Sequence, residues 1–547
     1  MPVFLINAGS ILGRGSARLE KDNLLYLVVQ RFAQVDLHPD NLDNTSMGYL
    51  FEELIRRFSE QSNETAGEHF TPREVIKLMV NLLFQEDHNA LNQKGVIRRL
   101  YDPACGTGGM LSIAEQYLKE LNPHAHLELY GQELNGESFA VCKSDMMIKG
   151  QNPKNIKYGN SFTEDGLPHE CFDYMLSNPP FGVEWKKVES KIKEEASDLG
   201  YDGRFGAGLP RVSDGSLLFV QHMISKMNKL SNDGAQISRI AVVLNGSPLF
   251  TGSAGSGESE IRRWIIENDW LEAIVALPTD MFYNTGIATY IWIITNKKKA
   301  ERRGKIQLIN AVDMSIPMRK SLGSKRKQIS EDQIKTITQW FGDFTANEHV
   351  KIFNNEDFGY SRIIVERPLR LNFAVTAERI QKLQSEAVFI KLKEVQQEAI
   401  IQVLKRLDPE QLWGSREIFL KVLKDSFKEQ KLDIKGSLLK TILQMLSERD
   451  EQAEICKDNK GNYEADGNLR DYENIPLTED IGVYFQHEVI PHVPDAWIDH
   501  SKTKVGYEIP FNRHFYKYVP PRSLEEIDAD LDKVTAEIMQ LLQEVHV

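Results

Sequence analysis

The sequence has no long apolar run and little cysteine. No stretch of about eighteen apolar residues occurs in the 547-residue chain, so we expect no membrane span. Its first residues lack the basic start and long apolar core of a secretory signal. The four cysteines, Cys105, Cys142, Cys171 and Cys456, have no metal-ligand spacing and are too few to cross-link a chain of this length. We therefore expect a reducing, cytoplasmic environment, no bound metal and no membrane contact.

Basic residues are also in deficit. The chain has 66 Lys+Arg against 79 Asp+Glu, a net charge of −13. A domain that holds nucleic acid by itself normally has a basic excess, so a nucleic-acid substrate would require a partner to supply much of the affinity. One span departs from this pattern. It is either a solvated loop between strands or a phosphate-facing patch, and its basic residues are Lys297, Lys298, Lys299, Arg302, Arg303, Lys305, Arg319, Lys320, Lys325, Arg326 and Lys327.

Strand and helix patterns alternate from about residue 95 to about residue 296. Such alternation predicts an α/β fold with a parallel sheet, helices on both faces and ligand sites at the carboxyl ends of the strands. The last two strands have no helix between them, so we expect them to be antiparallel neighbours. The seven predicted strands cover 95–101, 126–130, 156–158, 171–176, 239–244, 270–277 and 288–295, and the helices between them cover 110–121, 136–149, 216–227 and 258–268.

The segments that flank this α/β region have different patterns. Helical patterns at 24–32 and 47–59 carry apolar residues that we assign to a core, and residues 376–448 are rich in helical patterns. We divide the chain into five regions. They are a short helical N-terminal region (1–66), an α/β domain (67–330), a largely helical C-terminal extension (331–480), an aromatic and proline-containing docking segment (481–521) and a terminal coiled-coil-like helix (522–547).

The terminal helix has an apolar seam. Its apolar residues recur alternately after three and four positions, which is typical of the a and d positions of a coiled coil. We expect this seam to bind another helix, from this chain or from a partner, and we favour a partner. The seam residues are Leu524, Ile527, Leu531, Val534, Ile538, Leu541 and Val545.

The loop DPACGTGG at 102–109, after the first predicted strand, is one candidate site. Gly106 and Gly108 allow a tight turn and the close approach of a ligand, because no Cβ stands in the way. Asp102 and Glu133, which stand at the ends of two successive strands, add carboxylates that can bind an ammonium group and ribose hydroxyls. S-adenosylmethionine, which has both groups and no pyrophosphate, fits this site better than a dinucleotide does.

The loop NPPF at 178–181, after the fourth predicted strand, is a second candidate site. The side-chain oxygen of Asn178 and the carbonyl oxygen of Pro179 can accept hydrogen bonds from one exocyclic amine and aim its lone pair at a methyl group. Pro179 and Pro180 stiffen the backbone, and Phe181 offers a face on which a base can stack. No cysteine stands beside the prolines, so covalent attack on a cytosine carbon is disfavoured. An isolated NPPF would be interpreted as a turn, but its order after the glycine loop favours a site.

A third motif, at 71–75, predicts the start of a helix. Pro72 precedes the apolar positions Val75 and Ile76, so we expect Thr71 to be the N-cap. The free N–H groups of a helix start suit a carboxylate, although most Thr-Pro helix starts bind nothing.

Taken together, the motifs resemble the amino-group DNA methyltransferases, and more narrowly the modification (methylase) subunit of type I restriction-modification systems. The resemblance rests on GEHFTPREV at 67–75, DPACGTGG, Glu133 and NPPF, and it extends through 245–296 and 504–518. It implies a seven-strand Rossmann-like fold that uses S-adenosylmethionine to methylate N6 of an adenine flipped out of double-stranded DNA.

The resemblance also implies roles for single residues. The family often has an aspartate where Asn160 stands, beside the adenine of the cofactor, so we expect a weaker or altered contact there. The adenine target would be held by Asn178, Pro179, Pro180 and Phe181, and the cofactor by Glu68, His69, Phe70, Thr71, Pro72, Arg73, Asp102, Gly106, Thr107, Gly108, Glu133 and Asn160.

The resemblance implies partners as well. A separate specificity subunit would select the DNA sequence, with two modification subunits per specificity subunit, in agreement with the acidic charge; the presence of a restriction subunit stays open. Such subunits usually have a longer helical region before the first motif, so we expect a shortened or differently started product. Two alternatives stay open: an RNA or protein-glutamine methyltransferase, because NPP-aromatic loops also serve those amines, and a scaffold subunit made inactive by the shortened N-terminal region.

Overall fold

The computed structural model describes residues 24–34, 71–87, 91, 93, 95–229, 237–283, 285–458, 460–518 and 520–545. The predicted helix at 47–59 and the candidate residues Glu68, His69 and Phe70 lie outside these ranges. The chain forms two compact units, which consist of Met1–Thr251, Ile265–Phe353 and Glu508–Val547 in the first and Gly252–Trp264 and Asn354–Tyr507 in the second.

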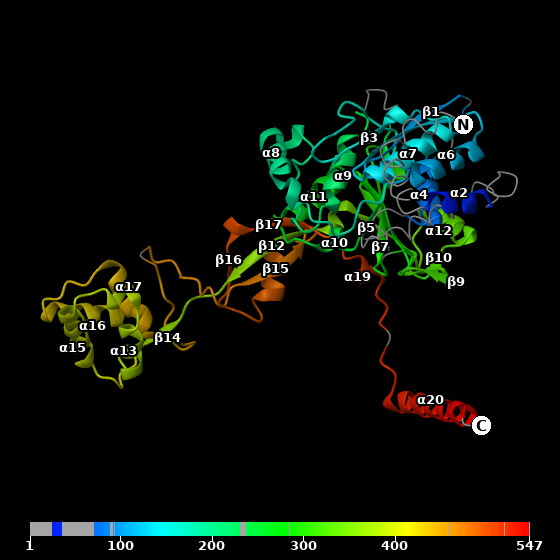
Figure 1. The fold of residues 1–547 in the computed structure, drawn as a ribbon. Helices are drawn as coiled ribbons and strands as arrows, with labels where there is room; N and C mark the ends of the chain where they lie inside the picture. The colour runs from blue at the N-terminus through cyan, green and yellow to red at the C-terminus, as the bar shows by residue number, and fades with distance from the viewer. Residues whose placement is uncertain are drawn as a thin grey trace. The chain divides into compact units, whose positions relative to one another are not determined.

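The first unit is built on a nine-stranded sheet with the order β11-β8-β6-β7-β5-β4-β1-β2-β3 (Figure 1). The pairs from β3 to β5 are parallel, as is the pair β6–β8, whereas β7 is antiparallel to both of its neighbours. The strands are β1 (Ile97–Asp102), β2 (His126–Glu133), β3 (Ile156–Tyr158), β4 (Tyr174–Ser177), β5 (Arg239–Asn245), β6 (Leu271–Ala276), β7 (Thr289–Thr295), β8 (Lys305–Asn310) and β11 (Val350–Asn354).

All seven predicted strands are present, and β6 and β7 are antiparallel neighbours as expected. The count of seven strands was nevertheless wrong for this sheet, because β8 and β11 extend it beyond β6. The apolar run of β8 is short and follows a lysine-rich segment, and β11 is mostly half-buried, so neither has a strong strand pattern. The sheet therefore continues past residue 330, where the sequence patterns placed the end of the α/β domain.

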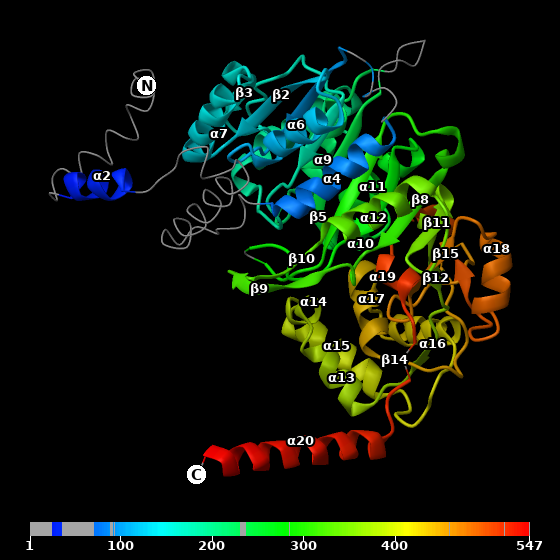
Figure 2. The same cartoon turned by 90° about the vertical axis from the view of Figure 1, so that its right-hand side faces the viewer.

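Helices cover both faces of this sheet. One face shares a single apolar core with side chains such as Leu100 and Tyr174. The next residue of β1, Tyr101, points to the opposite face, since successive strand side chains alternate, and it contacts His222 of α9 (Ser216–Ser225). The helices of the shared core are α4 (Arg73–Gln85), α6 (Gly109–Leu121), α7 (Gly136–Ile148) and α12 (Glu331–Asp343) (Figure 2). Further helices are α8 (Glu189–Leu199), α10 (Ser247–Phe250), α11 (Gly257–Glu267) and α19 (Phe511–Phe515).

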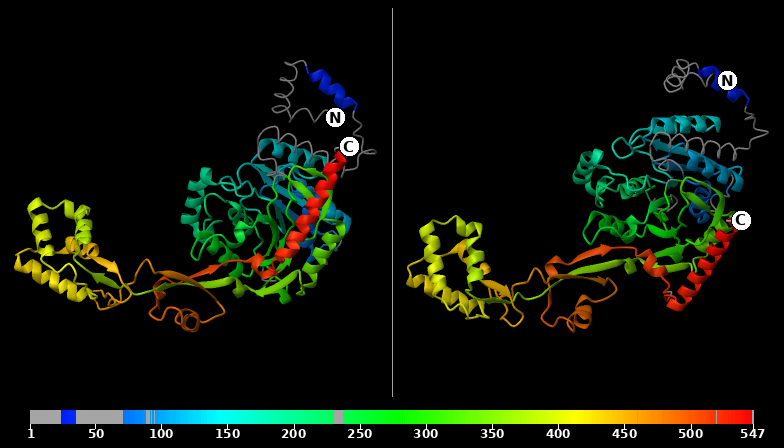
Figure 3. Two further views of the ribbon diagram at one scale, coloured as in Figure 1. Left: turned by 90° about the horizontal axis from the view of Figure 1, so that it is seen from below. Right: turned by 60° about the horizontal axis from the view of Figure 1, so that its bottom comes forward.

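The second unit combines a small sheet with a cluster of helices (Figure 3, yellow to orange). In the sheet, β12 (Gly359–Glu366) pairs with β15 (Asp471–Pro476), β16 (Trp497–Ile498) and β17 (Lys504–Tyr507), each antiparallel. The helices occupy much of the span in which helical patterns were predicted and share one apolar core. They are α13 (Ala377–Gln384), α14 (Ala387–Ile390), α15 (Glu394–Lys405), α16 (Arg416–Glu429) and α17 (Gly436–Met445).

The first and the last of the described helices expose several apolar residues. The predicted helix near residue 24 is present as α2 (Leu25–Ala33), but Leu24 and Leu27 are exposed, so their assignment to a core was wrong. The terminal helix α20 (Leu524–Val545) is present as predicted, and its apolar seam is exposed at Leu524, Ile527, Leu531, Val534, Ile538 and Leu541. None of the described helices has both the length and the apolar character needed to cross a membrane.

Candidate active site

The carboxyl ends of β1 and β4 meet where the strand order reverses. The chain moves from β1 to β2 and β3 on one side and from β4 to β5 on the other. Open α/β sheets bind ligands in the crevice at such a switch point. Ser177, the last residue of β4, donates a hydrogen bond from its hydroxyl to Asp102 Oδ1, the last residue of β1, over 2.9 Å. The loops at 102–109 and 178–181 therefore begin side by side.

Asp102 is a buried carboxyl group. Its side chain is 1% exposed, and Oδ1 also accepts a hydrogen bond from the backbone N–H of Ala104 at 2.9 Å. Burial is the largest effect on its pKa, which is raised from 3.8 to about 7; the charge of Glu133 acts in the same direction, and the hydrogen bonds from Ala104 and Ser177 oppose it. A nearby cation would therefore shift Asp102 toward its charged form near neutral pH.

The turn after Asp102 depends on two glycines in left-handed conformations. Gly106 has φ +54° and Gly108 has φ +86°, values that side chains with a Cβ rarely adopt. A Cβ at Gly108 would also lie 2.8 Å from Cys142 Sγ in α7. Thr107 between them is half-buried. The backbone can therefore turn into α6 at Gly109 only with glycine at both positions.

Glu133 holds this turn from the end of β2. Its Oε2 accepts a hydrogen bond from the Gly106 N–H at 2.8 Å, and its Oε1 accepts one from the Asn135 N–H at 2.7 Å. Each carboxylate oxygen can accept a second hydrogen bond. Asp102 and Glu133 therefore support one glycine turn and retain acceptor capacity for a ligand.

The loop after β4 contains a buried acceptor without a donor. Asn178 is 9% exposed, and its Oδ1 has no hydrogen-bond partner in the described part of the chain. A buried polar atom left unpaired costs about 1–3 kcal/mol, so such an atom calls for an explanation. Phe181 packs edge-on against Phe282, with ring centroids 5.8 Å apart. The loop thus combines a free acceptor with a supported aromatic ring.

Asn160 belongs to a third loop, after β3, that is tied to the same site. The hydroxyl of Ser161 donates to the carbonyl oxygen of Pro103 over 2.6 Å. Asn160 Oδ1 accepts from the Phe162 N–H at 2.9 Å. Since an N–H must face an oxygen, the amide orientation is determined, and Nδ2 takes the place where an aspartate would have its second oxygen. Asn160 therefore presents a donor at that place.

A buried polar network supports this third loop. Arg204 donates hydrogen bonds to the carbonyl oxygens of Ser161 and Phe162 at 2.7 and 2.6 Å. Arg204 Nη1 lies 3.1 Å from His222 Nδ1, and His222 Nε2 lies 3.1 Å from the hydroxyl of Tyr101. Burial first, and then the charge of Arg204, lower the pKa of His222 to about 3. His222 is therefore neutral, and because arginine only donates, its proton resides on Nε2.

The start of α4 differs from the prediction. The helix begins at Arg73, Pro72 occupies the cap position, and no side chain caps it, so Thr71 is not the N-cap. The Pro72 carbonyl accepts the first helical hydrogen bonds, from Val75 and Ile76. The hydrogen bonds around Asp102 do not extend to Thr71 or Pro72, and their place in a cofactor site stays a prediction.

Comparison with known proteins shows which family this site belongs to. A family model described as N-6 DNA methylase matches residues 42–367, more than half of the chain. The chain belongs to the N-6 DNA methylase family. Among the described residues, no group of three or more His, Cys, Asp or Glu side chains could hold a metal ion.

Relatives of this chain include named restriction-system subunits. The type I restriction enzyme MjaIX methylase subunit of Methanocaldococcus jannaschii is 26% identical over 72% of this chain and 65% of its own length. The HindI methylase subunit of Haemophilus influenzae is 31% identical over 48% of this chain and 54% of its own length. A solved methyltransferase subunit from Streptococcus thermophilus has a TM-score of 0.49 and 21% identity, covering 61% of this chain and 65% of that one. The chain thus spans between half and two thirds of these relatives.

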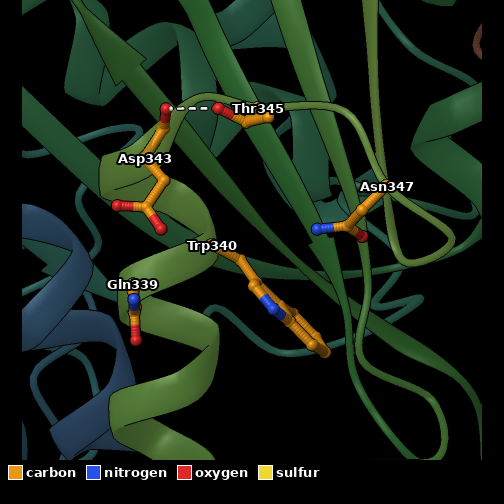
Figure 4. A pocket seen from close by; sticks show the side chains of 5 residues that line it. All are labelled: Gln339, Trp340, Asp343, Thr345 and Asn347. Carbon is orange, nitrogen blue, oxygen red and sulfur yellow. Dashed lines mark hydrogen bonds between the residues drawn. The ribbon is translucent and has the colours of Figure 1, made fainter.

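A separate pocket of about 520 Å³ lies at the end of α12 in this N-6 DNA methylase (Figure 4). It is lined by Gln339, Trp340, Asp343, Thr345 and Asn347, none of which belongs to the strand-end site. The pocket has one carboxylate and no second charged side chain among its lining residues, so we assign it no chemistry.

Sequence patterns did not identify four residues that support the site. Ser177 could have been found, because it directly precedes Asn178 at a strand end. Phe282, Arg204 and His222 had no such signal, because their contacts join segments far apart in the sequence of this N-6 DNA methylase.

Proposed function

We propose that this chain is the modification subunit of a type I restriction-modification system and transfers a methyl group from S-adenosylmethionine to N6 of adenine in double-stranded DNA. Its family and the names of its relatives support this function. The observation that carries it is the buried Asn178 Oδ1, which has no hydrogen-bond partner among the described residues and stands directly after the Ser177–Asp102 hydrogen bond. An exocyclic amine is a donor that would satisfy this oxygen.

The residues around the glycine turn fit S-adenosylmethionine. The turn has no Cβ at Gly106 or Gly108, and Asp102 and Glu133 retain acceptor capacity for ammonium and hydroxyl groups. When bound, this cofactor supplies a methyl group on a positively charged sulfur. Glu133 would hold the ribose and Asp102 would favour the cationic part of the ligand. Contacts from residues 68–73, Thr107 and Asn160 belong to the same proposal.

The residues of the NPPF loop would position the target adenine. Its N6 amine would donate to Asn178 Oδ1 and to the carbonyl oxygen of Pro179, which directs the nitrogen lone pair away from these acceptors. Phe181 would stack on the base, at about 1–3 kcal/mol per base, with Phe282 holding its ring in place. The base must leave the duplex to reach this loop. The chain therefore acts by positioning and not by covalent catalysis.

The proposed function includes partners. A specificity subunit would select the sequence in duplex DNA, with two modification subunits for each specificity subunit, and the exposed seam of α20 would bind a helix of a partner. We expect this assembly to work in the cytoplasm, with or without a restriction subunit.

Methyl transfer from tritiated S-adenosylmethionine to DNA that lacks host modification tests the function. We expect label in DNA when a specificity subunit is co-expressed, and N6-methyladenine after hydrolysis of that DNA. Label in RNA or protein in the absence of DNA would favour an RNA or protein-glutamine methyltransferase. No transfer with or without the specificity subunit would favour an inactive scaffold.

The Asn160→Asp variant is expected to bind S-adenosylmethionine about two- to tenfold more tightly. The new second oxygen would accept from an amine of the cofactor where Asn160 presents a donor, and one hydrogen bond contributes about 0.5–1.5 kcal/mol. Titration calorimetry on the full chain measures the change. Asn152→Asp is the matched control, because Asn152 Oδ1 accepts from the N–H two residues on in the same way and the charge change is equal. Equal affinity of the two variants would contradict the placement of Asn160 at the cofactor.

A further inference from the structure

The structure separates the basic span at 297–327 into two groups. In one group the cations are neutralised within the chain: Lys298 by Asp269, Lys299 by Glu86, Arg302 by Glu86 and Glu272, and Lys325 by Glu74. The other group has no ion-pair partner within the residues that the structure describes. It includes Arg319, Lys320, Arg326 and Lys327, and we refer to these four residues as the unpaired cations.

The unpaired cations stand on a two-stranded antiparallel ribbon, formed by β9 (Ile316–Leu322) and β10 (Lys325–Gln328) (Figure 2). We refer to these two strands as the basic ribbon. Arg319, Lys320 and Arg326 are exposed, and no residue of β9 is fully buried. An isolated two-stranded ribbon is marginally stable in water, so its contacts with the rest of the unit determine where it lies.

Those contacts come from the segment 280–283, after β6. The Ser324 N–H donates to the carbonyl oxygen of Tyr283 at 2.8 Å, and the N–H groups of Arg326 and Lys327 donate to that of Asp280 at 2.9 and 3.2 Å. Lys325 Nζ donates to the carbonyl oxygen of Met281 at 3.1 Å and also pairs with Glu74 of α4. The basic ribbon is therefore fixed by its backbone and by its one buried cation.

The same segment supports the base-binding loop. Phe282, which is 1% exposed, packs edge-on against Phe181. Phe282 and Asp280 are two residues apart, a separation of at most about 7 Å along the chain. One short segment thus contacts the aromatic ring of NPPF with one side chain and the basic ribbon with its carbonyl oxygens. Arg326 and Lys327, whose N–H groups bond to Asp280, are therefore connected to Phe181 through this one short segment, and β9 pairs with their strand.

We propose that the basic ribbon binds the phosphate backbone of duplex DNA next to the flipped adenine. This inference rests on the proposed function, because a base stacked on Phe181 brings its own flanking phosphates to the mouth of the loop. Phosphate contacts determine the register and orientation of a protein on DNA but do not read the base sequence. Such contacts suit a subunit whose partner selects the DNA sequence. Four unpaired cations on a chain of net charge −13 also form a local positive site that attracts a polyanion.

The salt dependence of DNA binding tests this inference. The logarithm of the affinity falls with the logarithm of salt concentration by about 0.9 per phosphate contact on duplex DNA. We expect the full chain with R319Q, K320Q, R326Q and K327Q together to show a slope smaller by about 3 to 4 in fluorescence anisotropy with a labelled duplex. The matched control is K421Q, K424Q, K428Q and K440Q, which removes the same charge from exposed lysines of α16 and α17 in the second unit. Its slope should equal that of the wild type.

Several outcomes would overturn the inference. An equal loss of salt-dependence slope in the two variants would show a general effect of charge. If the wild-type chain did not bind duplex DNA at low salt, DNA would not be the ligand of the basic ribbon. Binding to duplex RNA that depends on the ribbon, with no such binding to DNA, would assign it to another ligand. Unchanged affinity of the ribbon variant for S-adenosylmethionine shows that it is folded. Ribbon-dependent DNA binding without methyl transfer would leave this inference intact and contradict the proposed function alone.

Discussion

The Asn178→Ala variant is expected to transfer methyl groups to DNA about 10²–10³-fold more slowly than the wild type while binding S-adenosylmethionine equally well. In the proposed site, the buried Oδ1 would accept a hydrogen bond from the amine whose lone pair attacks, and the removal of one such preorganised group typically lowers the turnover rate by that factor. Single-turnover methylation of a duplex, with a specificity subunit present, measures the rate. Titration calorimetry measures the affinity for the cofactor.

Thermal stability separates this role from a structural one. Asn178 Oδ1 has no hydrogen-bond partner to lose in the part of the chain that the structure describes, so we expect the melting temperature of Asn178→Ala to stay close to that of the wild type. Asn122 is the matched control, since it is similarly buried at 7% exposure but bonds to Leu91, Gln93 and His124. Its alanine variant leaves buried acceptors unpaired and should lose about 1–3 kcal/mol of the free energy of unfolding. A destabilised Asn178→Ala, or one with normal turnover, would contradict the assignment.

The Asn178→Asp variant adds a graded test of the same residue. It keeps an oxygen at the position of Oδ1 and nearly the same volume, so part of the acceptor function is restored. We expect its rate of methyl transfer to lie between those of the wild type and of Asn178→Ala. A rate as low as that of the alanine variant would mean that the amide, and not its oxygen alone, is required.

The seven predicted strands could be found because strand and helix patterns alternate along this part of the chain. The same rule placed Asp102, Gly106 and Glu133 at neighbouring strand ends, and their hydrogen bonds show that they converge. The strand β8 was missed because its buried run is short and follows a lysine-rich segment, and β11 was missed because most of its residues are only half-buried.

Long-range polar contacts could not be predicted from the sequence. Arg204 stands forty-three residues from Ser161 in a glycine-rich stretch without a motif, yet it is the residue that binds the loop of Asn160. In the basic span, composition alone could not show that Lys298 and Arg302 are neutralised by distant acids whereas Arg319 is not. Charge counts describe a segment, but pairing depends on which segments the sheet brings together.

The Asp102→Asn variant is expected to be more stable than the wild type at pH 8 and to bind S-adenosylmethionine about 10- to 100-fold more weakly. An amide keeps the acceptor oxygen for the Ala104 N–H and the Ser177 hydroxyl but removes the buried charge. A hydrogen bond to a charged group contributes about 1.5–3 kcal/mol, which sets the expected loss of affinity. Chemical denaturation and titration calorimetry measure the two effects on the same protein.

In the wild type, we expect a rise in pH to lower the free energy of unfolding and to strengthen the binding of the cofactor. The two measurements on Asp102 therefore change in opposite directions. Folding raises the pKa of this carboxyl group from 3.8 to about 7, so the folded protein retains a proton that the unfolded chain has released, and the free energy of unfolding falls as the pH rises through this interval. Above pH 7 the buried charge of Asp102 lowers the free energy of unfolding of the wild type by at most about 4 kcal/mol. The gain in stability of Asp102→Asn over the wild type should therefore be largest above pH 7 and should shrink toward pH 4. A cationic ligand favours the carboxylate, so the affinity of the wild type for the cofactor should weaken as the pH falls below 7, whereas that of Asp102→Asn should not change. Equal stability of the two proteins at pH 8, or equal affinity for the cofactor, would remove Asp102 from the proposed cofactor site.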